Sequence, residues 1–174
     1  MHFELKSISV QSIPEALAKV ERYRLLNEPS LAESICLDIL AVQPDHQQTL
    51  ISLLLARTDQ FHSNMNVKGA HDVLSQIKGD YERAYYAGII LERMGHAHIQ
   101  RGGPGEAVYY ALIGAMDHFE RAIKLSAPGN DDAILRWNTC ARVIMQNPNI
   151  EPLSDDSRSD VWTADEAASR ISDS

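Results

Sequence analysis

Apolar side chains recur every three or four residues along most of this chain, which is the spacing of one face of an α-helix. β-branched residues do not alternate with polar ones over any useful stretch, so the sequence predicts no strands. Turn-forming residues divide the periodic stretches into seven predicted helices: 12–26, 30–43, 45–60, 66–77, 80–101, 106–126 and 131–145. The pattern therefore predicts an all-α fold.

Two of the predicted helices begin with the signature of a capping box. Ser12-Ile-Pro-Glu15 and Ser30-Leu-Ala-Glu33 both place a hydroxyl three residues before a glutamate. In a capping box the hydroxyl accepts a hydrogen bond from an amide of the first turn, and the glutamate reaches back to the cap residue. The strongest interruption in the chain is Arg101-Gly-Gly-Pro-Gly105, which predicts a turn between two long helices.

The composition changes after the last predicted helix, which stops near Asn147-Pro148. Residues 149–174 are acidic, rich in Ser and Asp, and poor in apolar residues, which predicts a largely irregular tail. Within it, Thr163-Ala-Asp-Glu166 is able to cap a short helix near 164–171, and Trp162 and Ile171 are the large apolar anchors. We therefore expect a helical domain over 1–148 and an acidic tail over 149–174.

Two segments share a spacing that is found in a known helical repeat. The residues are Ala32, Cys36, Ile39 and Pro44 in one segment, and Ala115, Phe119, Ala122 and Pro128 in the other. This spacing resembles the second helix of a tetratricopeptide repeat (TPR), in which small residues let two helices cross closely. Phe119-Glu-Arg-Ala-Ile-Lys-Leu125 reads much like the usual stretch of that family.

The resemblance extends to first helices of the repeat, with departures. Trp137, Cys140 and Ala141 fit the bulky position and the large–small pair that follows it. Ala32 and Ala115 are 83 residues apart (115 − 32), whereas two repeats of about 34 residues would separate them by about 68. The unusually long helices around Ile90 and Val108, together with a degenerate middle unit that has Leu54 at a normally small site, account for the extra residues. The resemblance then implies about three antiparallel helical hairpins with a degenerate centre. It covers roughly 12–57 and 81–146.

The same resemblance implies a binding surface. First helices of TPR units line a concave groove, and on this alignment the groove side carries Tyr85 and Arg93 on one helix and Asn138 and Arg142 on the last. These four residues are the predicted partner-binding residues, with helix packing for the tyrosine and a solvated face for the others as the alternative. The implied function is a protein–protein interaction scaffold or adaptor that is not an enzyme and needs no cofactor.

Two other functions remain open at this stage. Glu92 and His96 are four residues apart on one predicted helix, and with His118 they outline a small metal- or ligand-binding enzyme. The paired Glu-x-x-His motifs of a di-iron bundle are absent from the sequence, so we expect no catalytic or metal-binding residues. The second alternative is a homo-oligomeric structural subunit, because an array of a few repeats exposes apolar end faces.

Charge and composition indicate which kinds of partner the chain could bind. The net charge is −8, and seven acids with two arginines give residues 149–174 a charge of −5. Such a chain repels nucleic-acid phosphates, so a protein or peptide partner is favoured. No run approaches the roughly 20 apolar residues of a membrane span, and the first residues do not resemble a secretion signal.

The last two expectations concern the burial of the two cysteines and the role of the acidic tail. Cys36 and Cys140 lie within apolar helical patterns, which predicts two small buried hydrophobic residues and a reducing, cytoplasmic setting. A secondary hypothesis has the acidic tail either fold back over Arg93 and Arg142 and compete with partners, or dock a basic partner, with Trp162 as the anchor.

Overall fold

A computed structural model describes residues 2–153 of the chain. Within this range the fold is all-α, with one short 3₁₀ turn, seven α-helices and no strand. The elements are η1 (Val10–Ser12), α1 (Ile13–Leu25), α2 (Pro29–Val42), α3 (Gln47–Asp59), α4 (Val67–Leu74), α5 (Asp80–Gln100), α6 (Gly105–Leu125) and α7 (Asp132–Gln146). The all-α prediction and the number of helices are confirmed.

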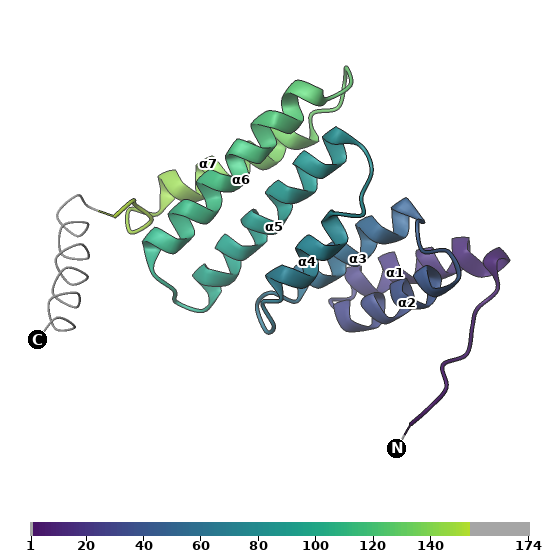
Figure 1. Cartoon of the computed structure of the whole chain (residues 1–174). Helices are drawn as coiled ribbons and strands as arrows, with labels where there is room; N and C mark the ends of the chain where they lie inside the picture. Colours follow the sequence, from purple (N-terminus) through teal and green to yellow (C-terminus); the bar gives the residue numbers. More distant parts are fainter. Residues whose placement is uncertain (1, 154–174) are drawn as a thin grey trace, which may run out of the picture.

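The helices form hairpins that stack along the chain. Each helix packs against the next one in sequence, and short turns make successive helices antiparallel (Figure 1). In addition, α1 contacts α3, and α3 contacts α5. The first helices of three successive hairpins, α1/α2, α3/α4 and α5/α6, therefore lie next to one another, and α7 packs against α6 at the end of the array.

Two large apolar clusters hold the array together. The first is built from α1 to α4 around Leu54 and Phe61, and the second from α5 to α7 around Phe119. Helix α5 belongs to both clusters, because Ile90 is buried in the first cluster and Ile89 in the second. This helix is therefore buried on two sides and joins the two halves of the molecule.

Small residues bring α5 and α6 into close contact. A β-carbon added at Gly88 would lie 2.5 Å from Cε1 of Phe119, and one added at Gly95 would lie 3.1 Å from Cδ2 of Leu112. Ala115, which faces α5 from α6, is fully buried. The close crossing that the spacing of small residues predicts is thus present.

Neither predicted capping box forms. The hydroxyl of Ser12 donates a hydrogen bond to the carbonyl of Ser9 at 2.7 Å, because the turn η1 precedes α1 and already holds Ser12 in a helical conformation. Helix α2 begins at Pro29, so Ser30 lies inside its first turn. Glu33 does not reach back either, since its carboxylate accepts hydrogen bonds from Arg57 at 2.8 Å and from Gln60 at 2.7 Å.

The end of the described chain packs against the start of α6. Ile150 is buried in the second apolar cluster. A β-carbon at Gly105 would lie only 1.8 Å from the carbonyl oxygen of Asn149, so this glycine gives the backbone of residues 149–150 room to dock. The packed body therefore extends to Ile150. Most of the predicted tail, including the expected short helix near 164–171, lies outside the described residues.

None of the helices within residues 2–153 combines the length and the apolar character that crossing a bilayer would require.

The close crossing of α5 and α6 predicts a difference between two glycine substitutions. We expect Gly88→Ala to destabilise the fold by about 1–3 kcal/mol, because the new methyl group overlaps the buried ring of Phe119. Gly114→Ala is the matched control in the middle of α6. Its β-carbon would meet only the flexible end of Leu91 at 3.2 Å, so we expect a change within about 1 kcal/mol of zero. Urea denaturation followed by circular dichroism measures both, and equal effects would contradict the close crossing.

Candidate functional site

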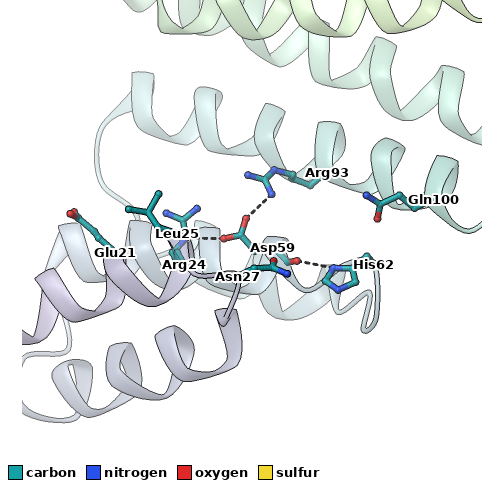
Figure 2. Close-up of a pocket in the computed structure, with 8 residues that line it drawn as sticks. All are labelled: Glu21, Arg24, Leu25, Asn27, Asp59, His62, Arg93 and Gln100. Carbon is teal, nitrogen blue, oxygen red and sulfur yellow. Dashed lines mark hydrogen bonds and ion pairs between the residues drawn. The ribbon is translucent and has the colours of Figure 1, made fainter.

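A pocket of about 620 Å³ lies where the first helices of the three hairpins meet. Its lining comes from the end of α1, the turn that follows α1, the end of α3 with the loop after it, and α5 (Figure 2). The residues that line it are Glu21, Arg24, Leu25, Asn27, Asp59, His62, Arg93 and Gln100. The pocket is therefore mainly polar, and every one of the three hairpins contributes to it.

One carboxylate lies between two guanidinium groups in this pocket. Arg24 Nε donates to Asp59 Oδ2 at 2.8 Å, and Arg93 Nη1 donates to Asp59 Oδ1 at 2.6 Å (Figure 2). The side chains are 22%, 17% and 30% exposed for Arg24, Asp59 and Arg93, so water screens these pairs only partly. The trio carries a net charge of +1, and the exposed Glu21 at the same pocket brings the local total to zero.

The hairpin turns fix the positions of these side chains. Asp59 is the last residue of α3, and Arg24 lies in the last turn of α1. Asn27 has a positive φ of 59°, which asparagine tolerates well and which lets the chain reverse within three residues before α2. On the other side, Arg101 donates to the carbonyls of Phe61 at 2.6 Å and His62 at 3.1 Å, which ties the loop after α3 to the end of α5.

Both arginines keep hydrogen-bonding capacity. A guanidinium group has five N–H donors, and the hydrogen bonds found within residues 2–153 use one nitrogen of Arg24 and one of Arg93, both for Asp59. Asn27 and Gln100 add side-chain amides, each of which is able to donate and to accept. The pocket thus offers several fixed donors and a smaller number of acceptors to a ligand.

Of the four residues predicted to bind a partner, the structure places only Arg93 in this pocket. Tyr85 is half-buried among other rings, with centroid distances of 5.7 Å to Tyr81, 5.1 Å to Tyr86 and 5.8 Å to Phe119. Its position fits the alternative of helix packing.

Asn138 and Arg142 lie on α7, which contributes no residue to the pocket. Arg142 is exposed and Asn138 is partly exposed. These two residues therefore belong to another surface. Arg24, Asn27 and Asp59 are not among the residues predicted from the sequence, because their positions in the pocket depend on how different hairpins meet.

Glu92, the first residue of the enzyme alternative, is buried and paired with an arginine. Glu92 is 2% exposed, and both of its carboxylate oxygens lie 3.4 Å from Nη1 of Arg136. His96 Nε2 is 3.9 Å from Glu92 Oε1. Burial by itself would lower the pKa of Arg136, because it disfavours the charged form. The negative charge of Glu92 and then a hydrogen bond with Tyr85 favour the charged form more strongly, so the pKa of Arg136 is raised. Glu92 is thus engaged by a cation from α7.

His118 lies in a separate environment. Burial, followed by the neighbouring charge of Arg121, lowers its pKa. Among residues 2–153 there is no group of three or more His, Cys, Asp or Glu side chains placed to hold a metal ion. The three residues Glu92, His96 and His118 therefore do not form a shared metal site in the described part of the chain.

Both cysteines are fully buried, as the sequence predicts. Cys36 is in the first apolar cluster and Cys140 is in the second. Burial raises the pKa of each thiol to about 12. Because the thiolate is the reactive form of cysteine, both side chains act as small apolar residues in the folded protein.

Comparison with protein-family models, with curated proteins and with solved structures found no match to this chain.

The arrangement around Asp59 predicts a large effect of a small substitution. We expect Asp59→Asn to destabilise the fold by about 1–3 kcal/mol, because it removes the charge that two partly buried arginines share. Asp72→Asn is the control, since its pair with Lys68 is 60% and 87% exposed and contributes within about 0.5 kcal/mol. Urea denaturation measures both variants. An effect of Asp59→Asn no larger than that of the control would show that the trio does not hold the helices together.

The buried cysteines predict thiols that do not react in the folded state. At pH 8 a thiol with a pKa of about 12 is ionised to about one part in ten thousand, so we expect negligible reaction with a disulfide reagent such as DTNB. In denaturant, both thiols should react within seconds. Rapid reaction of one thiol in the native protein would place that cysteine on the surface.

Proposed function

We propose that this chain is an interaction module that performs no chemistry and binds an extended segment of a partner protein in the pocket between α1, α3 and α5. The observation that carries the proposal is the Arg24–Asp59–Arg93 trio, which fixes polar side chains from three hairpins around one pocket. The scaffold or adaptor role inferred from the sequence is kept, with this pocket as its binding surface.

The chemistry of the pocket suits a peptide backbone. An extended segment presents unpaired N–H and C=O groups, which need both acceptors and donors. The free N–H groups of Arg24 and Arg93 suit carbonyl or carboxylate oxygens of the partner, whereas Glu21 suits its N–H groups. Leu25, which is 88% exposed at the same pocket, offers an apolar contact.

The fixed geometry of the arginines favours tight binding. A flexible arginine loses side-chain entropy when a ligand immobilises it, and this loss weakens binding. In this pocket Asp59 already holds both guanidinium groups, so much of that entropy is lost on folding. The ligand then meets donors that are in place before it arrives.

We further propose that the hairpins are TPR-like repeats. Two observations support this proposal. The residues that carry the resemblance, Ala32, Ala115, Phe119 and Ala122 among them, are fully buried at helix contacts. The first helices of successive hairpins also contact one another, which is the arrangement that the resemblance implies for a groove.

The setting we propose is a reducing compartment such as the cytoplasm, and the partner is a protein. Two buried free thiols in separate clusters suit a reducing environment. A net charge of −8 disfavours binding to nucleic acid.

Peptide selection tests the proposed pocket directly. Phage-displayed random peptides are selected on the intact chain, and the enriched peptides are then titrated by fluorescence anisotropy. We expect Arg93→Ala, and separately the double variant Glu21→Ala/Gln100→Ala, to weaken binding by at least about tenfold. Glu21 and Gln100 are exposed, so the second variant should keep the fold intact.

The matched control is Asn138→Ala/Arg142→Ala on α7, which should leave peptide affinity unchanged. Loss of affinity only in this control would move the binding site to α7. Failure to enrich any peptide, or equal binding by all three variants, would contradict the proposed function.

A further inference from the structure

The outward face of α7 exposes three large apolar side chains. Helix α7 packs against α6 through Ala133 and Cys140, which are fully buried. On its other side, Ile134 is 39% exposed, Leu135 is 62% exposed and Met145 is 75% exposed. Asn138 and Arg142 lie between these residues at helical spacing, so one continuous face carries all five side chains. We call it the α7 face.

This helix has no hairpin partner in the described part of the chain. The pairs α1/α2, α3/α4 and α5/α6 each bury one face of each helix against the other, whereas α7 follows as a single helix. A helix with a second apolar stripe is stable when that stripe is also covered. The α7 face is therefore a candidate docking surface.

The described part of the chain ends close to this helix, because Ile150 packs in the same apolar cluster as Val143 and Ile144 of α7. Ile150 is anchored four residues after the end of α7, and 21 residues (174 − 153) follow the last described residue, Leu153. The 11 residues from 151 to 161 span up to about 36 Å when extended, whereas a 15-residue helix such as α7 is about 22 Å long. Trp162 is thus tethered within reach of every point on the α7 face.

The sequence of this segment suits the surface. Val161, Ala164, Ala168 and Ile171 are spaced by three or four residues, and Trp162 lies beside the first of them. Residues 154–174 carry six acids and two arginines, which gives this segment a charge of −4, and the α7 face carries one exposed cation, Arg142. Residues 1–153 also carry −4 in total (−8 + 4), so the attraction is local to Arg142 and the apolar contact has to supply most of the stabilisation.

We propose that residues 161–171 of this same chain dock along the α7 face, cover Ile134, Leu135 and Met145, and place acidic side chains near Arg142. A second copy of the chain is the competing occupant. A tethered segment has an effective concentration on the order of millimolar, which exceeds the concentration of a second copy under ordinary conditions. In this proposal Asn138 and Arg142 serve the chain's own tail, separately from the peptide pocket.

Tryptophan fluorescence of the full-length chain tests the docking. The chain has two tryptophans, Trp137 and Trp162, so the difference between the intact protein and Trp162→Phe isolates the emission of Trp162. We expect this emission to be blue-shifted and several-fold less sensitive to acrylamide than in urea. In Leu135→Ser/Met145→Ser it should shift to the red and become accessible to acrylamide.

The control is Leu37→Ser on α2, a leucine of comparable exposure (48%) that lies away from α7, and it should leave the emission unchanged. Circular dichroism confirms that each variant is folded. If Trp162 of the intact chain emits like free tryptophan in water, the proposal is wrong.

Analytical ultracentrifugation separates the two occupants. A monomer whose Trp162 emission does not change on dilution supports docking within one chain. A dimer that Leu135→Ser/Met145→Ser dissociates, but that Trp162→Ser/Ile171→Ser leaves intact, would assign the α7 face to a second copy. A blue shift that disappears on dilution would also overturn docking within one chain.

Discussion

The proposed binding surface depends on one interaction, the pairing of the Asp59 carboxylate with Arg24 and Arg93. Apolar clusters pack the hairpins against one another, but an apolar contact has little directional preference and does not by itself fix a side chain at a pocket. The two hydrogen bonds of Asp59 with Arg24 and Arg93 connect the end of α3 to α1 and α5, and they stay partly shielded from water. The spacing of three first helices and the direction of two guanidinium groups are thereby set together.

Helix α5 connects the pocket to both halves of the fold. One of its sides belongs to the first apolar cluster and another belongs to the second, and Gly88 and Gly95 let α6 approach closely. Two neighbouring polar residues of α5 point in different directions. Arg93 faces the pocket, whereas Glu92 is buried against Arg136 of α7. Neighbouring residues on one helix thus take part in two separate charge networks, one in each half of the molecule.

The sequence predicts the helices better than it predicts the pocket. Helix positions follow from local breakers and periodicity, and all seven agree closely with the structure. Ser12 is the N-cap residue of α1, but the two predicted capping boxes are wrong, because η1 and Pro29 change the conformation of the first turns. Of the predicted partner-binding residues only Arg93 lines the pocket. The ion pairs of the pocket join residues 34 and 35 positions apart, and no local pattern indicates which hairpin ends meet. An arginine near the end of α1 and an aspartate at the end of α3 were the available signals.

The turn between α5 and α6 lies on the surface, but one end of it has no room for a larger residue. Surface turns usually accept insertions and substitutions, because little packs against them. Here the backbone of residues 149–150 rests directly on Gly105, with no space left for even one methyl group. A side chain at position 105 would therefore displace the backbone of residues 149–150, so this end of the turn should tolerate substitution less well than most exposed turns.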